Sequence, residues 1–113
     1  MKKIGSLFLA VVLGAAAGGF VWLFVLMMHI GGYPGNYTYA ARQLIEASPP
    51  KLFISGHSHI LKVMNDTHFH LLHINPGAAG IQGFHNVRTA VRFVMDAGNI
   101  RDLEIGEWPR SNL

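Results

Sequence analysis

Hydrophobic and polar positions divide the chain into an apolar leader, residues 1–24, and a longer mixed region, residues 25–113. Residues 4–28 contain no charged side chain, and Lys2 and Lys3 precede them. As a helix, a run of this length would cover roughly 38 Å, which exceeds the hydrocarbon core of about 30 Å. The pattern therefore favours one transmembrane helix, with the two lysines on the cytoplasmic side.

Two other interpretations of the leader stay open. A lysine pair, an apolar stretch through Leu13 and the small residues Ala15–Ala17 also form the three-part pattern of a signal peptide. Alternatively, glycines interrupt the run, and residues 20–28 are rich enough in aromatic and β-branched side chains for a buried strand. The first two interpretations predict a membrane-anchored or exported protein.

The mixed region begins with a loop and a short helix. Residues 31–36 are dominated by glycine, proline and asparagine, which is typical of a loop. Residues 38–47 then have one apolar side, Asn36 or Thr38 can cap them, and two prolines come next. This pattern predicts one helix.

Beyond the helix, most of the chain has the pattern of β-strands. The segments share short apolar runs or alternation with period two, and turn residues separate them. The predicted strands are 52–54, 60–65, 68–74, 87–95 and a last one around 103–105. Together with the helix they predict an α/β fold whose strands are mostly antiparallel.

Composition narrows the chemistry that the chain can perform. The net charge is +3, but the basic residues of the mixed region are scattered, which argues against nucleic-acid binding. The absence of cysteine excludes disulfides and thiolate metal sites. Seven histidines against six carboxylates leave imidazole as the abundant metal ligand or acid–base group.

The sharpest local feature is Gly56-His57-Ser58-His59, directly after the predicted strand 52–54. Two histidines at positions i and i+2 can converge on a metal where the backbone turns at a strand end. Gly56 lets the chain pass close to such a site. A His-x-His pair alone is common, so its sequence context decides how much weight it carries.

That context resembles the calcineurin-like metallophosphoesterase superfamily, and most closely its small bacterial phosphodiesterases of the YfcE type. Three motifs carry the resemblance in order: a strand ending in His29 and followed by glycines, the Gly-His-x-His at 56–59, and the Asn-Pro-Gly loop at 75–80. The resemblance runs from about Val25 to Trp108. It implies the C-terminal half of a two-sheet sandwich.

The resemblance also implies roles for single residues. The family binds two divalent metals, usually manganese, iron, zinc or magnesium, and its metal-activated hydroxide attacks a small phosphodiester. His29 and His57 would ligate one metal and His59 the other, while Gly56, Asn75 and Gly77 would shape the pocket. Manganese is the metal that the family favours, and its small phosphodiesterases are cytoplasmic.

The carboxylates of the family's opening motifs, Asp-x-His, Gly-Asp and Gly-Asn-x-Asp/Glu, are missing. No aspartate or glutamate precedes Glu46, so no catalytic residue is assigned. Three neutral imidazoles do not balance two adjacent dications, although one zinc on His29, His57 and His59 would be chemically acceptable. We therefore expect impaired phosphodiesterase activity; the alternative is a non-catalytic, membrane-tethered scaffold or a truncated remnant of such an enzyme.

The expected fold leaves one sheet uncovered, which predicts homo- or hetero-oligomerisation and poor solubility. The remaining histidines have simpler interpretations. His68 and His70 are expected on a solvated strand face, and His73 is expected to be packed or hydrogen-bonded. His85 lies in a predicted loop, at the rim of the expected phosphate site.

Overall fold

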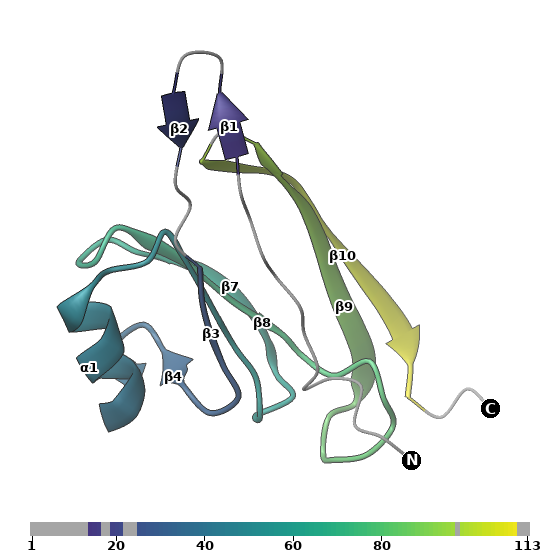
Figure 1. The fold of residues 1–113 in the computed structure, drawn as a ribbon. Coiled ribbons are helices and arrows are strands. Elements are labelled where there is room, and N and C mark those ends of the chain that lie inside the picture. Colours follow the sequence, from purple (N-terminus) through teal and green to yellow (C-terminus); the bar gives the residue numbers. More distant parts are fainter. Residues whose placement is uncertain (1–13, 17–18, 22–24, 97, 111–113) are drawn as a thin grey trace.

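A four-stranded mixed sheet lies at the centre of the fold in the computed structural model, which describes residues 14–16, 19–21, 25–96 and 98–110. Its strand order is β3 (Val25–Met28), β6 (Leu52–Ser55), β8 (Leu71–Pro76) and β7 (Leu61–Asp66). Figure 1 labels β3, β7 and β8 of this sheet. Strands β3, β6 and β8 are parallel, and β7 is antiparallel to β8. The carboxyl ends of three neighbouring strands therefore meet at one edge of the sheet.

The helix covers one face of this sheet. A two-residue hairpin, β4 (Gly32–Tyr33) and β5 (Asn36–Tyr37), leads into α1 (Tyr39–Ala47). Thr38 caps the helix, because its Oγ1 accepts a hydrogen bond from the backbone N–H of Ala41 at 3.2 Å. The helix buries Ala41 and Ile45, which are four residues apart on one side, in a cluster with Phe53 and Leu71 from the sheet. The predicted helix and its Thr38 cap are confirmed.

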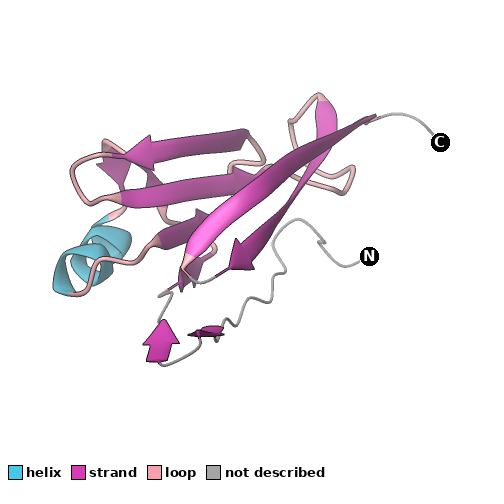
Figure 2. Cartoon of the chain, turned by 90° about the horizontal axis from the view of Figure 1, so that it is seen from above, coloured by secondary structure: helices cyan, strands magenta, loops and turns pink. Residues whose placement is uncertain are grey.

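A long hairpin covers the opposite face. It consists of β9 (Val87–Asp96) and β10 (Asn99–Pro109). Alternate residues of β9, from Val91 to Met95, pack on the buried cluster of Leu52, Ile54 and Ile74. Figure 2 shows helix and hairpin on opposite sides of the sheet. The sequence had led us to expect one uncovered sheet, and in the structure both faces of the sheet are covered. The poor solubility that we inferred from an uncovered sheet stays a prediction.

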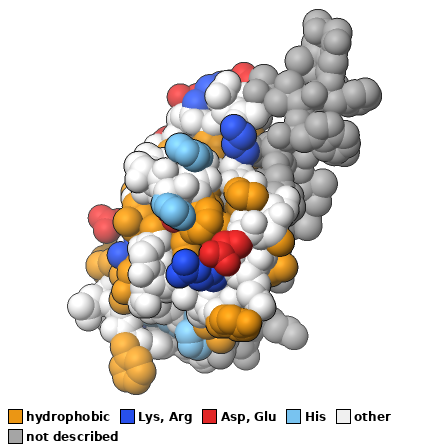
Figure 3. Space-filling view, turned by 90° about the vertical axis from the view of Figure 1, so that its left-hand side faces the viewer, with side chains coloured by type: hydrophobic (Ala, Val, Ile, Leu, Met, Phe, Trp, Pro, Cys, Tyr) orange, Lys and Arg blue, Asp and Glu red, His pale blue; other side chains and the backbone are white. Residues whose placement is uncertain are grey.

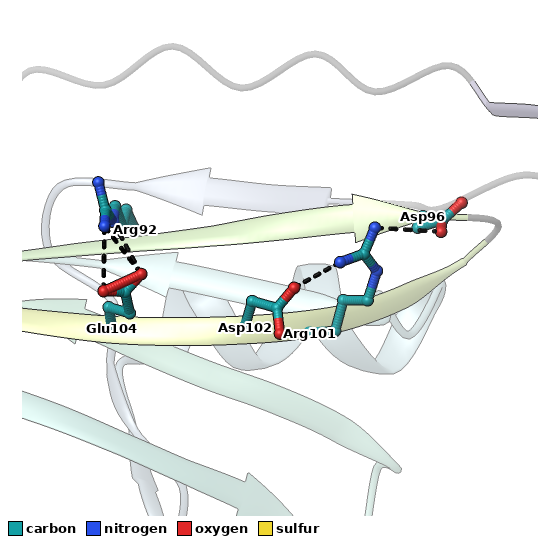
Figure 4. A network of polar contacts seen from close by, with 5 residues as sticks. All are labelled: Arg92, Asp96, Arg101, Asp102 and Glu104. Carbon is teal, nitrogen blue, oxygen red and sulfur yellow. Dashed lines mark hydrogen bonds and ion pairs between the residues drawn. The ribbon is translucent and has the colours of Figure 1, made fainter.

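Ion pairs on the outside of the hairpin accompany an irregular stretch of β10. The register of the two strands shifts between Arg101 and Glu104, and Asp102 there has a φ of 55°. Beyond the shift, Arg92 lies opposite Glu104 and donates two-pronged hydrogen bonds of 2.9–3.1 Å (Figure 4). Both side chains are exposed, so we expect at most about 1 kcal/mol from the pair. The apolar inner face, not this pair, holds the hairpin on the sheet.

Two sequence predictions in the middle of the chain need correction. The strand predicted at 68–74 begins at Leu71, because residues 67–70 form the turn. The Asp66 carboxylate widens this turn by accepting hydrogen bonds from the backbone N–H groups of His68 and Phe69 at 2.8 and 3.1 Å. His68 and His70 therefore lie in a turn and not on a strand face. The run of antiparallel strands was also wrong in part, since β8 pairs in parallel with β6.

Most of the expected leader falls outside the described residues, so its three interpretations stay predictions. Within it the structure describes a short antiparallel pair, β1 (Gly14–Ala16) and β2 (Gly19–Val21). Among the described residues, no helix has the length and apolar character needed to cross a membrane. The strand ending before His29 is confirmed as β3.

Candidate metal-binding site

Two of the three predicted ligands meet at the carboxyl edge of the sheet. His29 directly follows β3, and His57 follows the neighbouring parallel strand β6 after Gly56. Their ring centroids lie 5.0 Å apart with the rings nearly perpendicular, and both side chains are exposed. A hydrogen bond of 2.9 Å from the Gly56 N–H to the His29 carbonyl joins the two segments. Loops beyond the carboxyl ends of parallel strands are the usual ligand sites of such sheets.

The backbone that presents the second histidine is strained. His57 has a φ of 75°, and the N–H of Ser58 donates to the carbonyl of Gly56 at 2.9 Å, so the three residues form a γ-turn of positive φ. His59 follows with a φ of 63°. Such conformations cost about 1–3 kcal/mol each in residues other than glycine, and they cluster at functional sites. The local strain therefore supports a functional role for this turn.

Asn75, near the end of β8, holds the strained turn in place. It is 5% exposed, and its Nδ2 donates to Ser58 Oγ at 3.0 Å and to the Gly56 carbonyl at 3.4 Å. Its Oδ1 accepts from the N–H of Gly77 at 3.0 Å. Asn75 thus links the loop after β6 to the loop after β8. The structure brings together the three residues that the sequence predicted to shape the pocket.

His59 lies apart from this pair, against a residue to which the sequence gave no motif. The Nδ1 atoms of His59 and His85 are 3.3 Å apart, and their ring centroids are 5.0 Å apart. His85 Nε2 lies 2.8 Å from the Gly80 carbonyl oxygen. Among the residues that the structure describes, no three histidine, aspartate or glutamate side chains are grouped to hold a metal ion. The described residues thus do not group His59 with His29 and His57, and the three-histidine zinc site stays a prediction.

The described donors do not fit a centre of two metal ions. Manganese and magnesium require oxygen ligands, and the described residues supply paired imidazoles. The buried carboxylate of Asp66 lies at the opposite end of β8, where it accepts a 2.6 Å hydrogen bond from Tyr37. Glu46 pairs with Arg42 on the exposed side of α1. His29 and His57 can serve as two ligands of one ion and no more.

A pocket lies beside His57, and Gly56, His57 and Asn75 of its lining are residues that the sequence had assigned to the site. Its volume is about 450 Å³, and its lining includes Tyr33, Lys62 and the buried His73. Figure 3 shows the side of the molecule that carries α1, where histidines lie among hydrophobic, basic and acidic side chains. No sequence signal indicated Tyr33, Lys62 or His73 in this lining, because the pocket is formed where three stretches of the chain, 30–38, 56–62 and 73–75, come together.

Comparison with known families identifies one match. A family model described as a calcineurin-like phosphoesterase superfamily domain matches residues 13–98, which is well over half of the chain. A search of curated proteins finds no match. The matched range contains His29, the turn at His57 and Asn75, so the carboxyl edge of the sheet belongs to the matched domain.

Proposed function

The chain belongs to the calcineurin-like phosphoesterase superfamily, and from this we propose that it provides the histidine side of a metal-dependent phosphoesterase site. In this proposal His29 and His57 bind one divalent ion: the family favours manganese, whereas the two imidazoles suit zinc better. The observation that carries it is the 5.0 Å approach of the two imidazoles at the ends of adjacent parallel strands. Imidazole suits zinc, copper, iron and nickel.

We further propose that hydrolysis of a phosphodiester by this chain alone is impaired. A bound ion of this family would supply Lewis-acid chemistry and an activated hydroxide, but two adjacent dications need carboxylates to balance them. None of the described carboxylates is grouped with the histidines. A second polypeptide segment that brings aspartates to this edge would complete the site. We also propose that, within the superfamily, the chain is most similar to the small bacterial phosphodiesterases of the YfcE type.

Metal titration tests the first part. Calorimetric titration of the purified chain with manganese or zinc is expected to show one ion, and His29→Ala and His57→Ala are each expected to remove it. The matched control is His70→Asn, which removes an exposed histidine of the β7–β8 turn at a φ of 55° that asparagine tolerates. Equal binding by all four proteins would overturn the assignment of these ligands.

Turnover tests the second part. With manganese and an aryl phosphodiester, we expect the native chain to be no faster than His57→Ala. Hydrolysis that depends on His57 would show that the chain completes its own site, and would overturn the proposed impairment. Absence of both metal binding and turnover would favour the alternative, a non-catalytic scaffold that keeps the family fold.

A further inference from the structure

The pocket beside His57 has the size of a small-molecule site. Its volume of about 450 Å³ lies within the range of roughly 300–1,000 Å³ that is usual for such sites. His57 and Asn75 border it from the carboxyl edge, and Tyr33 and Asn36 border it from the β4–β5 hairpin. A phosphate ester bound at His57 could therefore extend its organic group into this space.

His73 gives the pocket an unusual polar group. The side chain is fully buried, and its Nδ1 lies 3.2 Å from the carbonyl oxygen of Phe53. Because a carbonyl only accepts hydrogen bonds, Nδ1 carries the proton. Burial, aided by the positive charge of Lys62 and opposed by the Phe53 hydrogen bond, lowers the pKa of His73 to about 4, so the ring is neutral at pH 7.

The other ring nitrogen of His73 is therefore a hydrogen-bond acceptor. Nε2 is buried, and within the described part of the chain it has no partner. An unsatisfied buried polar atom costs about 1–3 kcal/mol, so such atoms are uncommon without a ligand or another functional reason. A donor from a bound molecule would remove this cost.

Lys62 and Tyr33 add an aromatic surface and a positive charge. The Lys62 Nζ lies 4.6 Å from the centroid of the Tyr33 ring, in a cation–π contact. Tyr33 is 41% exposed, so its ring can also contact a ligand. Lys62 lines the pocket, and its positive charge favours an anionic ligand.

We propose that this pocket binds the organic group of a phosphate ester, and that this group is a ring with an O–H or N–H donor for His73 Nε2. Tyr33 contacts the ring, and Lys62 attracts the phosphate. The inference rests on the proposed phosphoesterase function for the position of the phosphate at His57. The pocket would select phosphate esters whose organic group is a ring with an O–H or N–H donor, and it would disfavour simple alkyl phosphates and inorganic phosphate.

The test compares two matched probes on the metal-free chain, 4-hydroxyphenyl phosphate and phenyl phosphate, which differ by one O–H donor. With ¹⁵N-labelled histidine, we expect the hydroxylated probe alone to shift the His73 Nε2 resonance toward that of a hydrogen-bonded nitrogen. Since one such hydrogen bond contributes about 0.5–1.5 kcal/mol, the hydroxylated probe should bind several-fold to about tenfold more tightly. In His73→Phe both probes should bind equally. In Lys62→Met both should weaken, with their ratio unchanged.

Equal affinities in the native chain, with no shift of the His73 resonance, would overturn the pocket proposal. The resonance is read in the native chain, so the result does not depend on whether His73→Phe folds. No metal is present in this experiment. Its outcome is therefore independent of whether His29 and His57 bind a metal ion. A donor preference that depends on His73, found together with failed metal titrations, would support the pocket and contradict the metal assignment.

Discussion

The Nδ1 atoms of His59 and His85 face each other at 3.3 Å, and their protons can be assigned from the next contact. His85 Nε2 lies 2.8 Å from the Gly80 carbonyl, which only accepts, so Nε2 carries the proton of the neutral ring. His85 Nδ1 is then the acceptor, and His59 Nδ1 is the donor. His59 is thereby held in the tautomer with an unprotonated Nε2, the form in which that nitrogen ligates a metal.

This assignment predicts that His85 controls the tautomer of His59. In the native chain at neutral pH, ¹⁵N NMR should show His59 protonated at Nδ1. In His85→Ala this acceptor is lost, and the Nδ1 resonance of His59 should move away from its position in the native chain. Gln82→Ala, an exposed change in the same loop, is the control and should leave the spectrum of His59 unchanged. Protonation of His59 at Nε2 in the native chain would contradict the assignment.

The strained γ-turn predicts that two substitutions of His57 with the same effect on metal binding differ in their effect on stability. His57→Ala and His57→Gly both remove the imidazole, but only glycine adopts the φ of 75° without strain. We expect both variants to lose metal binding, and His57→Gly to be the more stable of the two by about 1 kcal/mol. Urea denaturation of the metal-free variants measures the difference. Equal midpoints would show that the turn stores no strain.

Replacing Gly77 is predicted to lower stability both through its positive φ and through a steric collision. Gly77 and Gly35 both have positive φ, at 75° and 88°. A Cβ at Gly77 would collide with the side chain of Thr89, whereas one at Gly35 would meet nothing within 4 Å. Gly77→Ala and Gly35→Ala should share the backbone cost, and Gly77→Ala should lose about 1–3 kcal/mol more from the collision. Thermal denaturation of the pair isolates that difference, and equal losses would contradict it.

The sequence predicted those parts of the fold that depend on local patterns. Alternating side chains marked β9, Thr38 marked the start of α1, and the spacing of glycine and histidine marked the turn at His57. These features depend on neighbours in the chain, so the residues themselves specify them.

The remaining features depend on contacts between distant segments. The Asp66 side chain widens the β7–β8 turn, so His68 and His70 lie in this turn and not on the strand that the sequence predicted. The pairing of His59 with His85 joins two loops that lie 26 residues apart. The prediction that His73 is packed or hydrogen-bonded is confirmed, but its partner, the Phe53 carbonyl of β6, depends on the parallel pairing of β8 with β6, which a run of strand-like segments does not reveal.

Burial of the neutral His73 predicts a loss of stability in mild acid. Burial, assisted by the charge of Lys62, lowers its folded-state pKa to about 4, against about 6.5 for an unfolded chain. Between these values the unfolded chain binds a proton that the folded chain does not. Stability should therefore be unaffected by this group above about pH 7 and should fall as the pH drops from 6.5 to 4, by on the order of 3 kcal/mol in total.

Urea denaturation at pH 7.5 and pH 5 measures this loss. Asp66 should not obscure it, because burial raises its pKa but hydrogen bonds from Tyr37 and the backbone outweigh burial and place that pKa below its usual value. Asp66 therefore loses its proton-linked stabilisation only at lower pH. In His73→Phe the difference between the two pH values should shrink, while His70→Asn should keep it. An equal pH dependence in the native chain and His73→Phe would mean that the folded chain protonates His73 at pH 5 as readily as the unfolded chain does, which would contradict the lowered pKa.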